Sequence, residues 1–470
     1  RMTTIKPGDF IGNRYEVFKV FGGKRKTGMG ILYACKDLER NETLILKTFQ
    51  DKYINHERTI NKFKHEALTW ILLGKHPYIV NAKYVIKLDN KIYVALEYIP
   101  PDEQGRHTLQ DFLEEKISFK QALEWSLQFC WGMEYAFNKG IITHFDIKPS
   151  NIMITKEKTL KISDFGLAKI WDEQDIIDDW EVMTEECPEN LSFVCVYQEK
   201  KVTGSALWMA PERYEGEGDI RSDIYSFGVV MYQMVNEGKL PFAKQTLKSY
   251  YLNVKNQPIQ KVVTDLYPII EKCLQKKPMH RFQTFTELKE KLEALYQEEF
   301  GNRYQPLEIQ KEIREIRYKD KGISFLTLGL HKEAKKYFQK ALKQNPNDVE
   351  CLKHFAITLK RTGQLEKSID LFKKIISNTP ESIDIYFELA DAYRQIGDFS
   401  SSIDQFNRIL EKKPQDIKAL YQLGKTYQSQ GDLTSALNIF SALKDRAALK
   451  HTDLRKEVKK HLKKIKKSLK

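Results

Sequence analysis

The segment THFDIKPSNIMIT, residues 143–155, carries three side chains that could act together on a phosphorylated ligand. Asp146 is followed by Lys148 two positions later and by Asn151 five positions later. A carboxylate can orient a hydroxyl group, an ammonium group can offset phosphate charge, and an amide oxygen can bind magnesium. The spacing predicts a loop that holds a metal nucleotide beside a hydroxyl, as phosphoryl transfer requires.

Phosphoryl transfer depends on positioning and charge neutralisation more than on covalent chemistry. It needs a further cation for the phosphates and a further oxygen ligand for the metal. Lys47 in LILK, Glu66 in FKHEALTWILLGK and Asp164 in SDFG have suitable chemistry. Taken singly, a lysine on a strand is more often solvated, and an aspartate in a loop more often forms a cap or turn. The order and spacing of the segments together favour the chemical interpretation.

Two kinds of sequence must position these side chains. Between residues 10 and 97 the segments RYEVFKV, GILYACKD, TLILKTF, KYVIKL and KIYVALEYI have the β-branched and aromatic content of strands. The segment HERTINKFKHEALTWILLGK interrupts them with helical spacing. Helical patterns dominate from about residue 110 to 298, broken by loops around Asp146 and Asp164. We therefore predict an α+β domain over residues 10–298, with a small sheet lobe (10–97) and a larger helical lobe (98–298).

The motifs in this order resemble a eukaryotic-type Ser/Thr protein kinase, most closely its bacterial branch. GMGILYACKD is similar to the end of the family's Gly-rich loop, LILK to its third strand, and HFDIKPSN to its catalytic loop. SDFG is similar to its metal-binding turn, WMAPE to the end of its activation segment, and RSDIYSFGVV to its helix F. The resemblance implies a bilobal kinase fold, ATP and magnesium as cofactors, and a protein substrate that carries Ser or Thr.

The resemblance also implies roles for single residues of this sequence. It assigns catalysis to Asp146 and Lys148, and metal binding to Asn151 and Asp164. It places Glu212 and Arg281 in an ion pair. The nucleotide-binding residues would be Gly28, Gly30, Lys47, Glu66 and Glu97, and the structural or regulatory ones Phe145, Ser205, Glu212, Asp223 and Arg281.

Two features depart from the family pattern. The Gly-rich loop would need glycines where Arg25 and Thr27 stand, and KRKT is inserted before Gly28. Phe145 occupies the position of an arginine that, in many family members, pairs with a phosphate on the activation segment. Phe145 cannot form this ion pair, while the chemistry at Asp146 is unaffected. We therefore expect an active catalytic loop under a different control.

Two alternatives to a protein kinase each agree with part of the sequence. A kinase-like scaffold, or pseudokinase, that binds nucleotide and partner proteins is favoured by the irregular Gly-rich loop and disfavoured by the intact catalytic and metal positions. A small-molecule phosphotransferase is disfavoured by WMAPE and by the expected Glu212–Arg281 pair.

The segment from Asp164 to Glu212 is long for this family. Residues 172–189 hold nine acidic residues and no Lys or Arg. Composition favours a solvated surface insert. The alternative hypothesis is that the insert docks on a basic surface and gates substrate access.

A repeat of 34 residues follows a linker, residues 299–314. Glycines, prolines and phenylalanines each recur at this step, and we expect two helices in each unit. The repeat resembles the tetratricopeptide repeat (TPR) over residues 315–450, in four units, although Ser368 and Ser402 stand where that family prefers Ala. The predicted structure is an all-α TPR solenoid. The periodic positions are Gly329, Gly363, Gly397 and Gly431; Pro346, Pro380 and Pro414; and Phe338, Phe372, Phe406 and Phe440.

The resemblance implies a concave groove, lined by the first helix of each unit, that holds a peptide or protein. We expect an acidic, extended partner with apolar anchors, although the array could instead only pack on the kinase domain. The expected groove residues are Lys353, Lys360, Arg361, Phe387, Arg394, Lys418, Tyr421 and Lys425.

The basic character of the chain is concentrated at residues 451–470. Of the formal net charge of +13, residues 455–470 contribute +8, from nine Lys or Arg and one Glu. Helical spacing of apolar residues favours a helix that caps the last repeat. The alternatives are binding to an anionic membrane surface, to the acidic insert of the same chain, or to nucleic acid, and the nucleic-acid case is the weaker. The six cysteines show no zinc or disulfide pattern. Without a long apolar run or a leader pattern we expect a cytoplasmic protein.

Overall fold

The computed structural model describes residues 5–22, 30–51, 56–88, 91–165, 169–170, 204–242, 247–308, 314–444 and 453–468. The chain divides into two compact units, Arg1–Lys311 and Glu312–Lys470. Within the described ranges, no helix is long and apolar enough to cross a membrane.

The small lobe of the first unit is a six-stranded antiparallel sheet, as predicted. Its order is β1-β2-β3-β4-β6-β5, so each strand except β5 and β6 follows its neighbour in sequence. The core beneath one face contains Tyr15, Tyr33, Tyr84 and Tyr93. The strands are β1 Phe10–Ile11, β2 Tyr15–Gly22, β3 Gly30–Asp37, β4 Glu42–Phe49, β5 Ala82–Leu88 and β6 Lys91–Glu97.

Helix α1, Glu57–Leu73, packs against β4 and β5. It begins at His56, whose side chain accepts the backbone N–H of Thr59 and so satisfies one of the free donors of the first turn. Apolar residues at helical spacing, including Phe63 and Trp70, are buried on its inner side. This arrangement brings Glu66, on the same helix, to Lys47 on the sheet.

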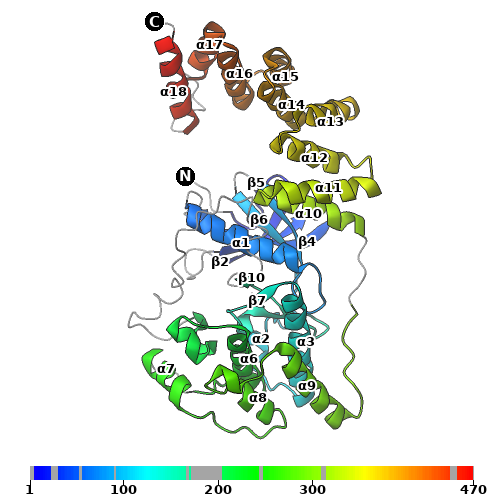
Figure 1. Ribbon diagram of the computed structural model, residues 1–470, viewed down its shortest axis with the longest axis vertical. Coiled ribbons are helices and arrows are strands. Elements are labelled where there is room, and N and C mark those ends of the chain that lie inside the picture. Colours follow the sequence, from blue (N-terminus) through cyan, green and yellow to red (C-terminus); the bar gives the residue numbers. More distant parts are fainter. Residues whose placement is uncertain are drawn as a thin grey trace. The chain divides into compact units, whose positions relative to one another are not determined.

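The large lobe is mainly helical and lies at the other end of this unit in Figure 1. Phe129 of α3 stacks on Phe227 of α6 with ring centroids 3.8 Å apart, and Phe285 at the start of α9 packs on both. The elements are α2 Leu109–Phe112, α3 Phe119–Asn138, β7 Ile141–Thr143, η2 Pro149–Asn151, β8 Ile152–Ile154, β9 Leu160–Ile162, β10 Lys169–Ile170, η3 Gly204–Trp208, η4 Pro211–Glu215, α6 Ile220–Val235, α7 Leu247–Asn256, α8 Tyr267–Cys273, η5 Pro278–His280 and α9 Phe285–Phe300.

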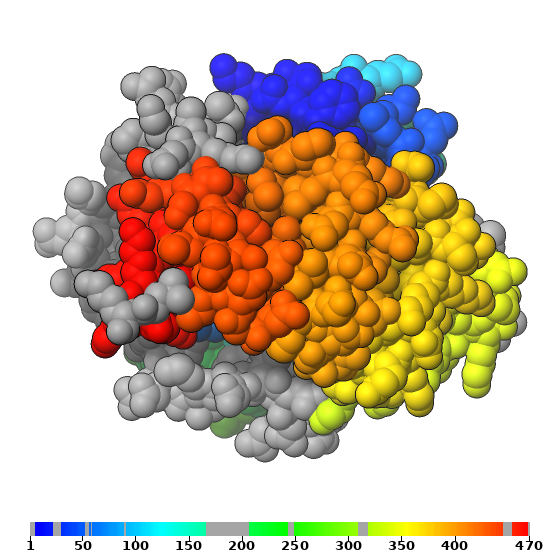
Figure 2. Space-filling model, turned by 90° about the horizontal axis from the view of Figure 1, so that it is seen from above, coloured from blue at the N-terminus to red at the C-terminus, as the bar shows by residue number. Residues whose placement is uncertain are grey.

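The second unit consists of paired helices, which confirms the predicted repeat array. Figure 2 shows its successive helices side by side in sequence order, from yellow to red. Gly329, Gly363, Gly397 and Gly431 all have φ between 76° and 92°, so each turn within a pair uses a left-handed residue. The helices are α10 Arg314–Leu328, α11 His331–Gln344, α12 Val349–Arg361, α13 Leu365–Asn378, α14 Ile383–Gln395, α15 Phe399–Lys412, α16 Ile417–Gln430, α17 Leu433–Lys444 and α18 Asp453–Ser468.

The two serine departures from the repeat consensus have a structural reason. The hydroxyl of Ser368 donates to the carbonyl of Ala356 at 2.7 Å, and that of Ser402 to the carbonyl of Ala390 at 2.8 Å. Both serines are fully buried. Because each hydroxyl is satisfied, a polar residue is tolerated at this core position.

Helix α18 covers the last repeat. Val458, Leu462 and Ile465 are buried against Phe440 and Leu443 of α17. The opposite side of α18 carries exposed lysines. The apolar contact is the one expected of a capping helix.

Candidate active site

A cavity of about 690 Å³ lies between the two lobes of the first unit. Strands β3, β4 and β6 and helix α1 contribute one side of its lining, and the segments around Asp146 and Asp164 contribute the other. Seven of the predicted site residues therefore line one cavity: Gly30, Lys47, Glu66, Glu97, Asp146, Asn151 and Asp164.

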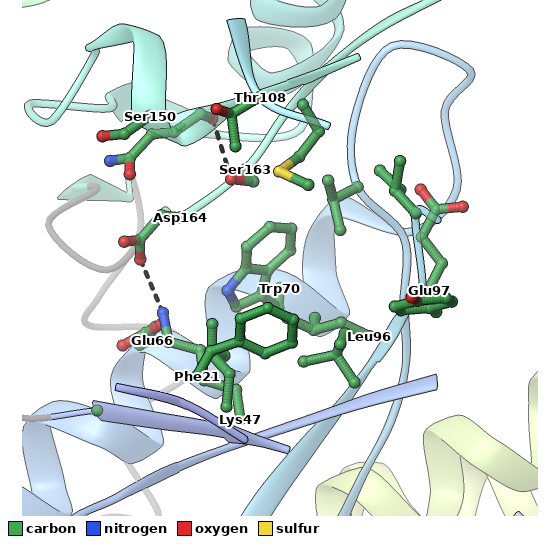
Figure 3. A pocket seen from close by; sticks show the side chains of 18 of the residues that line it. Phe21, Lys47, Glu66, Trp70, Leu96, Glu97, Thr108, Ser150, Ser163 and Asp164 are labelled. Carbon is green, nitrogen blue, oxygen red and sulfur yellow. Dashed lines mark hydrogen bonds and ion pairs between the residues drawn. The ribbon is translucent and has the colours of Figure 1, made fainter. Parts of the chain in front are cut away.

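Lys47 is the centre of the charged cluster in this cavity. Its ammonium contacts the carboxylate of Glu66, and its Nζ lies 2.7 Å from Oδ1 of Asp164. Figure 3 shows Lys47 and Asp164 directed toward one another across the pocket. Burial acts to lower the pKa of Lys47, but the charges of Asp164 and Glu66 outweigh it and raise this pKa. The charge of Lys47 in turn lowers the pKa of Asp164, so the pair is ionised.

The three residues of the opening motif form one hydrogen-bonded group. Nζ of Lys148 lies 2.8 and 2.9 Å from the two carboxylate oxygens of Asp146. The amide nitrogen of Asn151 donates to the backbone carbonyl and to Oδ2 of Asp146, each at 2.9 Å. Both contacts use the amide nitrogen, so among the described residues the amide oxygen of Asn151 remains available to a ligand.

The backbone of this loop is held by Asp223 of α6. One carboxylate oxygen accepts the N–H of His144 at 2.6 Å, and the other accepts the N–H of Phe145 at 2.8 Å. Asp223 is fully buried, and burial raises its pKa to about 7. Phe145 has φ of 62°, an uncommon conformation for a residue other than glycine.

Phe165, the residue after Asp164, packs the turn that carries Asp164 against both lobes of the first unit. The ring of Phe165 meets Trp70 of α1 edge to face at 5.3 Å and lies 4.6 Å from the ring of His144. Our sequence interpretation did not identify Trp70. Its position four residues after Glu66 places both on one face of α1, and this was the available signal.

The structure describes two of the three remaining residues that we expect to bind nucleotide, Gly30 and Glu97. Gly30 begins β3 and lines the cavity, whereas Gly28 lies outside the described residues. Glu97 ends β6, but its carboxylate accepts the N–H of Asn81 at 2.9 Å and lies 2.8 Å from Nζ of Lys161. The Glu97 side chain thus braces the segment between the lobes.

The end of the activation segment is anchored in the large lobe. Arg281 donates to both carboxylate oxygens of Glu212, at 2.6 and 2.8 Å, and is almost completely buried. The expected ion pair is therefore formed. Ser205 lies in η3, with a side chain outside the described set, and residues 172–189 of the acidic insert are likewise not described.

The expected groove of the repeat array is less open than the sequence suggested. Lys360 is buried, and its Nζ lies 2.7 Å from Glu388 and 2.6 Å from Asp391. Lys353 pairs with Asp384, and Arg394 pairs with Asp391. The two lysines are neutralised between neighbouring repeats, because helix stacking brings residues 31 positions apart together, whereas Arg394 pairs with Asp391 within α14.

The fourth repeat breaks this ladder of ion pairs. Lys418 and Lys425 stand one repeat after Asp384 and Asp391, so cations occupy the positions where the third repeat has carboxylates. Nζ of Lys418 lies 4.6 Å from the ring centroid of Phe387, and that of Lys425 lies 5.7 Å from the ring centroid of Tyr421. Burial and the nearby Arg394 lower the pKa of Lys425. Positive charge and aromatic rings therefore gather at the fourth repeat, while Arg361 is exposed at the end of α12.

The oxygen donors at the catalytic cavity suit magnesium. Among the described residues, no group of three or more His, Cys, Asp or Glu could hold a metal without further ligands. Asp164 and Asn151 offer a carboxylate and an amide oxygen, and Mg²⁺ is commonly bound through one or two such groups together with phosphates and water. The residues present thus fit a metal that arrives with a nucleotide.

Comparison with known families agrees with this geometry. Residues 25–294, more than half of the chain, match the protein kinase domain. The chain belongs to the protein kinase family. Tetratricopeptide repeat families match parts of the second unit of this kinase, at residues 320–348, 337–370, 354–417 and 387–450.

Bacterial kinases are among its relatives. A probable serine/threonine-protein kinase of Clostridium perfringens is 31% identical over 298 residues, covering 61% of this chain and 39% of that protein. A probable serine/threonine-protein kinase of Clostridium acetobutylicum is 29% identical over 321 residues, covering 65% and 44%. Serine/threonine-protein kinase PknB of Mycobacterium tuberculosis is 28% identical over 293 residues, covering 59% and 42%. The chain spans about two fifths of the length of these curated relatives.

Proposed function

We propose that the chain is an ATP- and magnesium-dependent protein Ser/Thr kinase whose repeat array recruits a substrate or regulator. The observation that carries this proposal is the junction at Lys47. Its ammonium contacts Glu66 and Asp164 in the same cavity that contains Asp146 and Asn151. Parts that are distant in sequence meet in the arrangement that phosphoryl transfer needs.

Each residue has a defined task in this proposal. Lys47, held by Glu66, contacts the phosphates of the nucleotide. Asp146 accepts a hydrogen bond from the attacking hydroxyl, and Lys148 offsets charge on the transferred phosphoryl group. Asp164 and Asn151 hold the metal. Bound magnesium supplies charge neutralisation at the phosphate oxygens.

The sequence and the relatives both support a Ser or Thr hydroxyl as the group that accepts the phosphate. Lys148 follows Asp146 by two positions, as in the Ser/Thr branch of the family, and the relatives named above are described as serine/threonine-protein kinases. We propose a Ser or Thr hydroxyl as the acceptor. Control by an arginine–phosphate contact at the catalytic loop is excluded from the proposal because residue 145 is Phe.

The test is transfer of the γ-phosphate from labelled ATP to the protein itself and to a generic basic substrate. Wild type should incorporate label, and Asp146→Asn should reduce the rate by at least ~100-fold, since the hydroxyl loses its orienting carboxylate. Asp265→Asn, at an exposed aspartate of the same lobe, is the matched control and should match wild type. Equal incorporation by wild type and Asp146→Asn would contradict the proposal.

The alternative of a kinase-like scaffold predicts a different result. ATP would bind with measurable affinity, but neither wild type nor variant would transfer phosphate. The assay with ATP binding measured in parallel therefore separates the two functions.

For the repeat array we propose an acidic partner that binds at the fourth repeat. In the part of the chain that the structure describes, Lys418 and Lys425 form no ion pair with a following repeat like those that neutralise Lys353 and Lys360, and Phe387 and Tyr421 offer apolar anchors beside them. A fluorescent peptide of alternating Glu and Leu serves as the probe.

Joint replacement of Lys418 and Lys425 by Glu should weaken binding of this probe at least ~10-fold. The control is joint replacement by Glu of Lys374 and Lys413, two exposed lysines elsewhere in the array. It should leave the affinity for the peptide nearly unchanged. Equal losses in both variants would indicate a response to net charge alone and would refute a site at the fourth repeat.

A further inference from the structure

The ring of Phe145 is covered by a cation from the end of the activation segment. The guanidinium carbon of Arg213, in η4, lies 3.8 Å from the centroid of the Phe145 ring. This is within the range in which a cation and an aromatic face attract one another. The contact joins the residue immediately before Asp146 to the residue immediately after Glu212.

Phe145 needs such support because of its backbone. Its φ of 62° is costly for a side chain of this size, so surrounding contacts must hold the conformation. Asp223 fixes the backbone by accepting the N–H of Phe145. Arg213 holds the ring. The two contacts act on different parts of the same residue.

Arg213 is itself built into its place. Glu212, the preceding residue, is clamped by Arg281. Gly218 leaves space for the Arg213 side chain: a Cβ at residue 218 would lie 2.4 Å from Cδ of Arg213. Arg213 is half-buried, and burial lowers its pKa against the opposing charges of Asp223 and Glu212. The surrounding residues therefore hold the half-buried guanidinium of Arg213 at this position.

The Arg213–Phe145 contact lies beside the carboxylate of Asp146 and outside the cavity in which we propose that the nucleotide binds. Arg213, Phe145 and Asp146 line one small cavity together with Asp223. Arg213 is not among the described residues that line the nucleotide cavity. A change at Arg213 should therefore alter the placement of Asp146 and leave nucleotide binding intact.

We propose that Arg213 is a positioning residue that fixes Phe145, and through it Asp146, by stacking its guanidinium on the Phe145 ring. The stack serves as an internal replacement for the arginine–phosphate contact that residue 145 cannot form. This inference rests on the proposed kinase function.

The experiment compares full-length variants in the phosphate-transfer assay. Arg213→Met keeps much of the length of the side chain and removes its charge, and it should lower kcat by about twofold to thirtyfold, the range that a cation–π contact of ~0.5–2 kcal/mol permits. KM for ATP should stay within about twofold of wild type. Arg213→Lys keeps a cation and should recover most of kcat.

Phe145→Leu tests the other half of the contact and should lower kcat to a similar extent. The double variant Phe145→Leu/Arg213→Met should be no slower than the more impaired single variant, because the two changes remove one interaction. Arg40→Met is the matched control, since its guanidinium lies 4.4 Å from the Tyr84 ring centroid and does not line the catalytic cavity. It should leave kcat unchanged.

Thermal unfolding of each variant separates positioning from loss of fold. A Tm within a few degrees of wild type with reduced kcat supports the proposal. Wild-type kcat in Arg213→Met, or additive losses in the double variant, would overturn it while Asp146→Asn still showed the protein to be a kinase. Failure of wild type to transfer phosphate would instead refute the proposed function.

Discussion

Lys47 and Asp164 form an ion pair with Nζ and Oδ1 2.7 Å apart, although 117 positions separate them in the sequence. Glu66 contacts the same ammonium from α1. One cation thus connects the sheet, helix α1 and the turn that carries Asp164. The position of α1 and that of Asp164 are therefore coupled through a single side chain.

Removing this cation should abolish most activity. We expect Lys47→Met to lower the rate of phosphate transfer by about 10²–10³-fold, because the phosphates lose a preorganised charge and two carboxylates are left facing each other. Initial rates at saturating ATP measure the effect. Lys83→Met is the matched control, since Lys83 pairs with Glu42 on the same sheet and does not line the cavity. A similar loss in both variants would argue that the sheet, not the site, is damaged.

The Glu212–Arg281 pair should contribute to stability more than surface pairs do. Arg281→Met leaves the partly buried carboxylate of Glu212 without its cation, although the Ser222 hydroxyl still donates to it, so we expect a loss of about 3 kcal/mol in the free energy of unfolding. Urea denaturation measures it. Arg221→Met, which breaks a partly exposed pair with Asp219, should cost no more than about 1 kcal/mol. Equal losses of unfolding free energy in Arg281→Met and Arg221→Met would contradict the larger contribution that we expect from the Glu212–Arg281 pair.

Sequence patterns predicted the elements better than the contacts between them. The strands and the four repeats follow from local periodicity, and the candidate site residues that line the cavity follow from short motifs in order. Arg213 was missed because its partner Phe145 lies on a different segment, and an aromatic–cation contact leaves no local pattern. Lys360 was expected in an open groove, but stacking of the next repeat supplies Asp391 and buries it. A search for opposite charges 31 positions apart would have found that pairing.

His76 should make stability depend on pH. Its ring stacks on Tyr135 at 4.4 Å, and its Nδ1 accepts the N–H of Tyr78 at 3.3 Å. Burial and the charge of Lys161 lower its pKa to about 4 from the usual 6.5. Between these values the unfolded chain binds the proton and the folded chain does not, so acidification from pH 6.5 to 4 favours unfolding.

The expected contribution of His76 is at most about 3 kcal/mol across that window. Urea denaturation at a series of pH values gives the free energy of unfolding as a function of pH. The contribution of His76 is the difference between the slopes of this curve for wild type and for His76→Gln. His280→Gln, at an exposed histidine, is the control and should keep the wild-type slope. Parallel curves for wild type and His76→Gln would contradict the assignment.

Close packing of two helices should make Gly322 sensitive to the smallest side chain. A Cβ at residue 322 would lie 2.6 Å from the fully buried ring of Phe338, whereas at Gly424 it would lie 3.0 Å from Phe440. We expect Gly322→Ala to cost about 1–3 kcal/mol by overpacking. Gly424→Ala should cost less, because the gain in helix propensity of about 1 kcal/mol offsets a milder contact. Thermal unfolding that ranks the two variants in the opposite order would refute this.

The ion pairs between neighbouring repeats have a consequence for ionic strength. Lys353 and Lys360 already hold carboxylates of the next repeat, so an acidic ligand at these positions would exchange one carboxylate for another and release few counterions. At Lys418 and Lys425, which stand where such carboxylates would be, the same ligand would displace salt from the surface. The dependence of affinity on salt concentration therefore reports the repeat at which a ligand sits, without any change to the protein.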